Sequence, residues 1–196
     1  MLSLLRTAAL AVFSVVAMPV TAENNIYNGY QIPNFTVSVA DGPFELRRYD
    51  SHIVAELEVE GSRGSAIRQG FRGLAGYIFG KNSGSEKISM TAPVTQTATG
   101  DAWRVQFMMP RSHDVADLPR PNNDQISIRE TEPETQAVIG FSGLWSDQKL
   151  RKKTQELKAW VASKGLKTVG DPRYYFYNDP FTLPWKRRNE VAFLIE

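Results

Sequence analysis

The same order of predicted secondary structure occurs twice along this sequence, and this duplication limits the possible folds more than any other feature. In each half, alternating apolar and polar residues predict two strands, a longer apolar period predicts a helix, and two further strands follow. The copies cover about residues 41–110 and 124–196, a repeat of roughly 80 residues. We therefore expect one α+β domain over residues 41–196, either a single sheet or a distorted barrel, with a helix on each half.

The stretch at residues 87–96 lies in the middle of the first copy. Ile88 and Met90 alternate with Ser89 and Thr91, which predicts a strand with one buried face. Because Pro93 cannot donate a backbone hydrogen bond, this strand is expected at a sheet edge or at a bulge.

The first helix is expected to begin near Ser65, which can cap it. Apolar residues at helical spacing predict one stripe that faces either the core or a ligand: Ile67, Phe71, Leu74 and Ile78. Glycines at positions 70, 73 and 76 each cost roughly 1 kcal/mol of helix stability relative to alanine. Their spacing predicts close approach of either the sheet or a flat ligand. The second helix is expected after Ser146 and should end near Gly165.

Residues 1–22 have the layout of a secretory signal peptide. Arg6 precedes an apolar run over residues 8–17, and the small residues up to Ala22 predict cleavage after that position. We expect a secreted, periplasmic protein with no stable membrane span after cleavage, because the apolar run is short and Pro19 interrupts its end. An uncleaved membrane anchor is the alternative. Residues 23–40 are expected to form an extended lead-in with little order of their own.

The composition argues against several classes of function. The chain has no cysteine and only two histidines, His52 and His113, whose spacing does not suit a zinc site. Its 23 Lys and Arg are interleaved with 21 Asp and Glu, so no basic footprint for nucleic acid is present. No Gly-x-Ser-x-Gly elbow and no Walker-type phosphate loop occurs. We therefore assign no catalytic residue.

The last loop, residues 178–189, combines apolar and basic side chains between two predicted strands. Phe181, Leu183 and Trp185 lie close in sequence to Lys186, Arg187 and Arg188. If exposed, these side chains would suit an amphipathic ligand with a flat apolar body and carboxylates. A well-packed hairpin loop with a cationic rim is the alternative.

Four stretches occur in order along the chain: FELRRY at residues 44–49, AIRQGFRGLAGY at 66–77, KISMTAPVTQ at 87–96 and RRNEV at 187–191. In this combination the chain resembles the SOUL haem-binding-protein family from about residue 41 to the C-terminus. The resemblance implies a pseudo-twofold, distorted antiparallel β-barrel flanked by two helices, in agreement with the duplication.

The resemblance also implies a position for haem or another tetrapyrrole, between the first helix and the loop before the last strand. The implied apolar contacts are Ile67, Phe71 and Leu74 on the helix and Phe181, Leu183 and Trp185 on the loop. Arg68 would bind a propionate, with Lys186 or Arg187 assisting from the loop. For the iron, the resemblance leaves open His52, Tyr77 or no protein ligand.

The leading hypothesis is therefore non-catalytic binding, sequestration or transport of haem or a related tetrapyrrole. The alternatives are a porphyrin-modifying enzyme and a binding module for another apolar ligand in the cell envelope.

Overall fold

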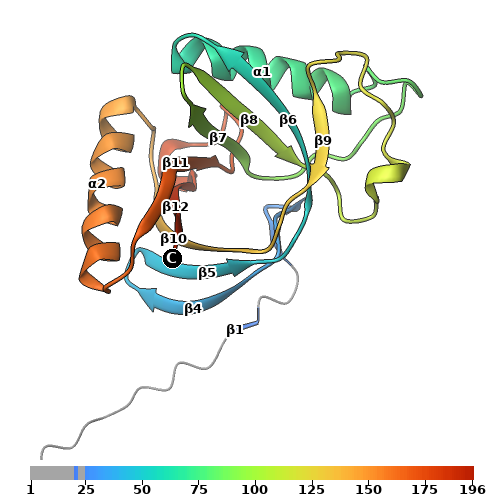
Figure 1. The fold of residues 1–196 in the computed structure, drawn as a ribbon. Coiled ribbons are helices and arrows are strands. Elements are labelled where there is room, and N and C mark those ends of the chain that lie inside the picture. Colours follow the sequence, from blue (N-terminus) through green and yellow to red (C-terminus); the bar gives the residue numbers. More distant parts are fainter. Residues whose placement is uncertain (1–19, 22–24) are drawn as a thin grey trace, which may run out of the picture.

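A computed structural model describes residues 20–21 and 25–196. The predicted signal peptide and its cleavage after Ala22 lie almost entirely outside the described residues, so both stay predictions. Within the described part, no helix is long and apolar enough to cross a membrane. The fold is α+β: two α-helices pack against different parts of one large, strongly curved antiparallel sheet (Figure 1).

The duplicated order predicted from the sequence is confirmed. The first copy consists of β5 (Phe44–Tyr49), β6 (Ile53–Glu60), α1 (Arg63–Ile78), β7 (Val94–Thr99) and β8 (Ala102–Met108). The second consists of β9 (Ser127–Glu130), β10 (Glu134–Phe141), α2 (Asp147–Ser163), β11 (Thr168–Phe176) and β12 (Asn189–Ile195). The remaining elements are β1 (Val20–Thr21), β2 (Ile26–Tyr27), β3 (Tyr30–Gln31), β4 (Phe35–Asp41) and the 3₁₀ turns η1 (Val115–Asp117) and η2 (Pro184–Lys186).

The two copies exchange their first strands. The sheet order is β1-β4-β5-β10-β12-β11-β7-β8-β6-β9, so β5 of the first copy pairs with β10 of the second, and β9 of the second pairs with β6 of the first. The copies also meet where β7 pairs with β11. Among the described residues the pairing leaves β1 and β9 at opposite edges. The sheet is therefore open: the predicted α+β class with two helices is confirmed, whereas the predicted distorted barrel is not.

The expected lead-in contributes to the sheet, contrary to the sequence analysis. Strand β4 pairs antiparallel with β5, with Phe35 opposite Tyr49 and Asp41 opposite Phe44. The Phe35 and Tyr49 rings lie 5.1 Å apart. The alternation of Phe35, Val37 and Val39 with Thr36 and Ser38 is the sequence signal for this strand.

The stretch at residues 87–96 also differs from its prediction. The strand begins only at Val94 and lies between β8 and β11, inside the sheet and not at its edge. Before it, the Ile88 amide donates to the Ile78 carbonyl at the end of α1, and the Ala92 amide donates to the Gln31 carbonyl. Ile88 is 5% exposed and Met90 is 42% exposed, so the two do not share a buried face. Ile88 packs in the core next to α1, and the end of α1 and Gln31 of β3 accept the backbone hydrogen bonds of this segment.

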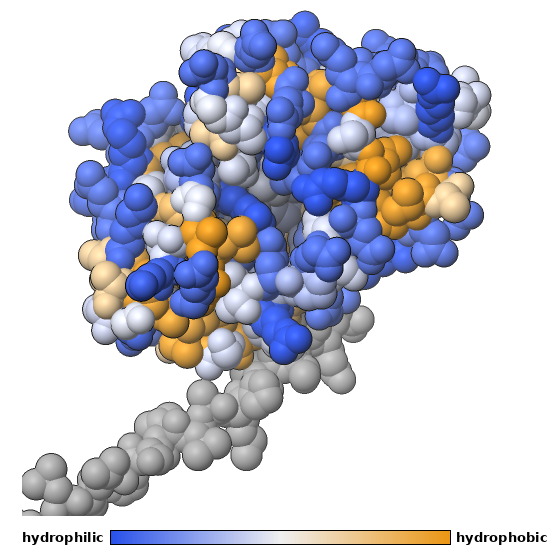
Figure 2. All heavy atoms as spheres, in the orientation of Figure 1, coloured by the Kyte–Doolittle hydropathy of each residue, from blue (hydrophilic) through white to orange (hydrophobic). Residues whose placement is uncertain are grey.

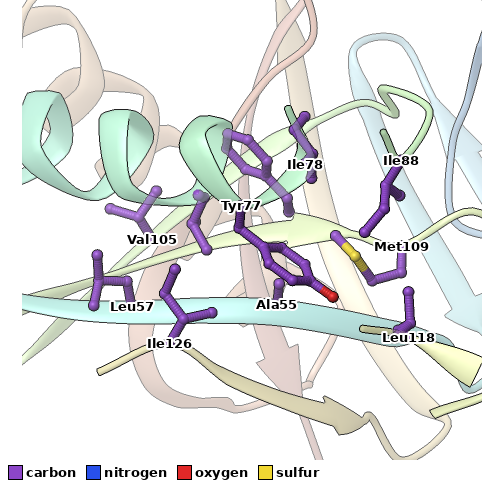
Figure 3. Close-up of a cluster of buried hydrophobic side chains, with 11 residues drawn as sticks. Ala55, Leu57, Tyr77, Ile78, Ile88, Val105, Met109, Leu118 and Ile126 are labelled. Atoms are coloured by element: carbon purple, nitrogen blue, oxygen red, sulfur yellow. The ribbon is translucent and has the colours of Figure 1, made fainter. Parts of the chain in front are cut away.

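Helix α1 lies across β6 and β8 and buries Leu74, Tyr77 and Ile78 with residues from both strands (Figure 3). Its glycines allow this close packing: a Cβ added at Gly70 would lie 2.6 Å from Val105 Cγ2, and one at Gly73 would lie 2.7 Å from Leu57 Cδ2. Helix-on-sheet packing therefore explains both glycines. The helix begins at Arg63 after Ser62, earlier than predicted from Ser65.

Helix α2 covers β10, β11 and β12. As predicted, Ser146 caps it, with its hydroxyl accepting a hydrogen bond from the Lys149 amide. The buried side chains of the helix, Leu150, Leu157, Trp160 and Val161, join the second core cluster.

Candidate functional site

A groove of about 780 Å³ runs along one side of α1. Its apolar lining comes from α1 and the following turn, from the segment before β7 and the first residue of that strand, and from the second copy: Ile67, Phe71, Ala75, Phe79, Met90, Ala92, Val94, Trp145, Phe176 and Pro180. The groove thus brings together residues that lie far apart in the sequence and belong to both copies.

Helix α1 can line a core and a groove at once because it carries two adjacent apolar rows with a spacing of four residues. Ala66, Gly70 and Leu74 form the first row and are buried towards the sheet. Ile67, Phe71 and Ala75 form the second row and line the groove. The sequence analysis treated Ile67, Phe71 and Leu74 as one stripe, and the resemblance placed all three in the site; the structure assigns Leu74 to the buried row.

Aromatic contacts fix the walls of the groove. Phe71 is 42% exposed and packs edge-to-face on Phe107, with ring centroids 5.4 Å apart. On the opposite wall, the Trp145 and Phe176 rings lie 5.3 Å apart. Such pairs hold large apolar surfaces in a defined orientation, so the groove offers a preformed apolar wall on both sides.

Arg63 links this second wall to the start of α1. Its guanidinium donates hydrogen bonds to Asp147 Oδ1 at 2.8 Å and to Gln96 Oε1 at 2.7 Å. It also lies 4.6 Å from the ring centroid of Trp145 and 5.6 Å from that of Phe176. Arg63 is the first residue of α1 and bonds to Asp147, the first residue of α2. It therefore positions Trp145 relative to α1.

The charged residues that line the groove are mostly basic. Arg68, Arg72 and Lys81 line it, and none of them pairs with a carboxylate among the described residues. The acidic lining residue is Asp179. Its carboxylate accepts bonds from the Phe181 and Thr182 amides and the Thr182 hydroxyl, and the Thr182 hydroxyl bond contributes most to lowering its pKa. The groove therefore combines an apolar surface with cations that are available to anionic groups.

The structure brings only part of the predicted site together. Ile67, Arg68 and Phe71 line the groove. Leu74 is fully buried in the core and does not line it. The last loop lines the groove through Asn178, Asp179 and Pro180. The loop residues that were predicted for the site lie beside the groove: Phe181, Leu183, Trp185, Lys186 and Arg187.

Arg187 supports the loop. Its Nε donates to the Thr182 carbonyl at 2.8 Å and its Nη2 donates to the Pro180 carbonyl at 2.6 Å. The guanidinium of Arg187 is thus engaged within the loop, whereas Lys186 is exposed. Of the two residues predicted to assist a propionate, Lys186 is the more accessible. Sequence reasoning missed Arg72, Lys81, Met90, Trp145 and Phe176, because no single period or motif relates them.

The two candidate iron ligands lie elsewhere. His52 lines other cavities, and its Nδ1 lies 3.1 Å from the Asp50 carbonyl and 3.2 Å from the Thr131 hydroxyl. Burial lowers the pKa of His52, which keeps the imidazole neutral at pH 7. Tyr77 donates to the Pro119 carbonyl at 3.0 Å, and burial raises its pKa to about 12. Neither side chain lines the groove.

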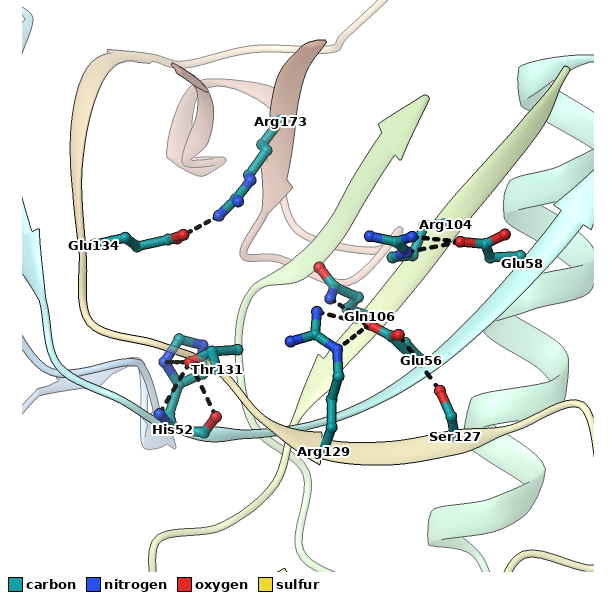
Figure 4. Close-up of polar contacts among 10 residues, drawn as sticks. All are labelled: His52, Glu56, Glu58, Arg104, Gln106, Ser127, Arg129, Thr131, Glu134 and Arg173. Carbon is teal, nitrogen blue, oxygen red and sulfur yellow. Dashed lines mark hydrogen bonds and ion pairs between the residues drawn. The ribbon is translucent and has the colours of Figure 1, made fainter. Parts of the chain in front are cut away.

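The cavity that contains His52 lies inside the curve of the sheet and has a volume of about 280 Å³. Charged side chains in and around it pair with one another: Arg173 with Glu134, Arg129 with Glu56 and Arg104 with Glu58 (Figure 4). Figure 2 shows hydrophilic residues around the hollow between the two copies. Because this chamber is small and its charges are paired, the groove along α1 is the better candidate for a large apolar ligand.

A buried polar network lies between the chamber and the base of the last loop. Glu190 is 1% exposed and accepts two hydrogen bonds from Arg47, at 2.9 and 3.0 Å. Arg188 and the Tyr177 hydroxyl donate to the same carboxylate. Burial alone would raise the pKa of Glu190, but Arg47 and Arg188 outweigh it, so the pKa is lowered. The network fixes Arg188 and Tyr177 where the last loop leaves the sheet.

Comparisons with known proteins agree with this architecture. The family described as "SOUL heme-binding protein" matches residues 30–194. The chain is 32% identical over 164 residues to "Heme-binding protein 2" of Mus musculus, covering 76% of this chain and 77% of that protein. It is 31% identical over 188 residues to "Heme-binding protein 2" of Homo sapiens, covering 88% of this chain and 90% of that protein.

Solved structures share the fold at low sequence identity. The C-terminal domain of EcmrR superposes with a TM-score of 0.61 at 15% identity, covering 78% of this chain and 96% of that domain. A structure described as a hydrolase from Listeria innocua superposes with a TM-score of 0.57 at 11% identity, covering 81% of this chain and 94% of that chain. These two similarities concern the fold alone. The family match over residues 30–194, together with the identity to two proteins described as "Heme-binding protein 2", places this chain in the SOUL heme-binding protein family.

Proposed function

We propose that this protein binds haem or a related tetrapyrrole in the groove along α1 and sequesters or carries it without changing it chemically. The observation that carries the proposal is the combination, in one groove of about 780 Å³, of preformed apolar walls with Arg68, Arg72 and Lys81. A tetrapyrrole such as haem is a flat apolar ring with carboxylates at one edge. Its ring would contact Ile67, Phe71 and Trp145, while its carboxylates would meet the cations.

A haemin titration followed by Soret absorbance tests this assignment. Arg68→Glu/Arg72→Glu reverses two charges in the groove and leaves its apolar walls unchanged. We expect this variant to bind haemin about tenfold or more weakly, because two partly exposed charge contacts become repulsive. Arg151→Glu/Lys152→Glu is the matched control, since both residues are exposed on α2. Equal affinity of the groove variant and the control would contradict the assignment.

The residues that line the groove supply contact surface and positive charge, which supports a role in binding. Conversion of the porphyrin is the competing function from the sequence analysis. Incubating the haemin-loaded protein with reductant and oxygen, followed by chromatography of the extracted pigment, separates the two. Recovery of intact haem is expected, whereas protein-dependent conversion to another pigment would favour the enzyme.

We further propose that the protein acts outside the cytoplasm after removal of residues 1–22. Such cleavage would also remove β1, a two-residue strand that pairs only with β4 at the edge of the sheet. Amino-terminal sequencing of the protein recovered from the periplasm would show Glu23 as the first residue; an intact Met1 in that fraction would contradict the cleavage.

A further inference from the structure

We infer that the loop between β11 and β12 docks on an anionic lipid bilayer, with Phe181, Leu183 and Trp185 inserted at the level of the headgroups. The inference concerns a surface beside the groove and does not require a bound tetrapyrrole. It would, however, give the groove of the proposed function direct access to a membrane in which an amphipathic ring can dissolve.

The first observation is the exposure of large apolar side chains on this loop. Phe181 is 93% exposed, Trp185 68% and Leu183 48%. Leu144, on the neighbouring loop after β10, is 59% exposed. The two loops lie together, because the Gly143 amide donates to the Pro184 carbonyl at 2.9 Å and Asn189 Nδ2 donates to the Gly143 carbonyl at 2.9 Å. Large apolar side chains that are exposed together on two contacting loops are typical of an interaction site.

The second observation is that the loop pairs several of its own polar groups. The Asp179 carboxylate accepts bonds from the Phe181 and Thr182 amides. Arg187 donates to the Pro180 and Thr182 carbonyls, and the turn η2 adds a bond from the Arg187 amide to the Pro184 carbonyl. Backbone groups that are already paired lose little when they leave water. The loop can therefore enter the interfacial region of a bilayer without a large desolvation penalty.

The third observation is the charge of the loop. Arg188 pairs with the buried Glu190, whereas Lys186 and Arg187 have no carboxylate partner among the described residues and lie near one acid of the loop, Asp179. Asp179 is engaged in bonds within the loop, and Lys186 is exposed. Tryptophan and phenylalanine next to basic residues are the composition of segments that bind at the interface of anionic membranes. Phe181 is 93% exposed and therefore projects from the protein surface. A projecting side chain of this kind can insert into a fluid bilayer.

The loop also forms one end of the groove. Asp179 and Pro180 line the groove, and so does Trp145, the residue after Leu144. A docked loop would thus place this end of the groove against the bilayer. A tetrapyrrole could then pass between membrane and protein without crossing bulk water.

Vesicle cosedimentation tests the inference with the full-chain protein, without haemin. The probes are vesicles of phosphatidylcholine alone and vesicles that contain equimolar phosphatidylglycerol. The wild type should bind the anionic vesicles and shift its tryptophan emission to the blue, and Trp185→Phe should remove most of that shift. Phe181→Ser/Trp185→Ser should lower partitioning at least tenfold, because two interfacial anchors are lost. Lys186→Glu should weaken binding to the anionic vesicles only.

Val115→Ser/Val169→Ser is the matched control, since both valines are exposed and lie outside the two loops. All variants share one amino terminus, so differences between them report the loop. Binding of the loop variant as strong as that of the control would overturn the inference. Absence of wild-type binding to both kinds of vesicle would also overturn the inference. This includes the case in which the protein self-associates through this loop. Failure of the haemin titration would not affect this result, because no haemin is present.

Discussion

At the scale of single residues, Glu190 is where the buried polar network converges. Two of the stretches that suggested the family, residues 44–49 and 187–191, meet in this network through Arg47, Arg188 and Glu190. Arg47, Arg188 and Glu190 in these stretches are therefore explained by a network that links β5 and β12, which both pair with β10.

Replacing Glu190 with Gln should destabilise the protein by about 3 kcal/mol, because it removes the buried carboxylate that pairs with both Arg47 and Arg188 and leaves Arg47 only the partly exposed Glu45. Urea unfolding measures this loss of free energy. Glu58→Gln is the control: Glu58 pairs with Arg104 but its side chain is 49% exposed, so a change within about 0.5 kcal/mol is expected. Equal stability of the Glu190 variant and the wild type would refute a structural role for the network.

The same carboxylate gives a pH dependence. Its pKa in the folded protein lies below the ordinary value of 4.5, because the two guanidinium groups outweigh the effect of burial. The stabilisation it provides is thus complete above pH 4.5 and is lost as the pH falls through the lowered pKa. Acid unfolding of the Glu190→Gln variant should show a smaller loss of stability over this range than that of the wild type; parallel curves would contradict the lowered pKa.

At the scale of elements, α1 shows what sequence periodicity can and cannot predict. Its presence and a close approach at its glycines follow from composition and spacing, but the sequence left open whether the sheet or a flat ligand approaches there. The division of its apolar residues between core and groove does not follow from them, because rows that start at Ala66 and Ile67 lie side by side on the helix and have the same spacing. Only the position of β6 and β8 decides which row is buried.

Substituting Gly70 with Ala tests this packing. An alanine favours a helix interior by about 1 kcal/mol, but its Cβ would lie 2.6 Å from Val105 Cγ2. We expect net destabilisation of roughly 1–3 kcal/mol from overpacking, partly relieved when Val105 is changed to Ala. Gly64→Ala is the control, because its Cβ would meet nothing closer than Arg68 Nη1 at 3.6 Å. Thermal unfolding should rank Gly70→Ala below the wild type and Gly64→Ala at or above it; a stabilised Gly70→Ala would mean that the helix lies farther from the sheet.

At the scale of the whole molecule, the duplication predicted the order of elements from β5 to β12, including both helices. It did not predict that β5 and β9 exchange between copies or that the sheet stays open, because local periodicity carries no information on which strands pair. The groove illustrates the same limit. Ile67, Arg68 and Phe71 were predicted, but Met90, Trp145 and Phe176 reach the groove only through the packing of both copies.

The central claim is that a tetrapyrrole binds along α1, and a map of the binding site tests it most directly. Backbone amide chemical shifts of the isotope-labelled protein would be followed as zinc protoporphyrin, a diamagnetic analogue of haem, is added. The predicted result is that the largest changes fall in residues 67–79, 90–94 and 176–180, which border the groove. Changes centred instead on His52, Glu134 and Arg173 would place the ligand in the chamber inside the sheet and would contradict the account.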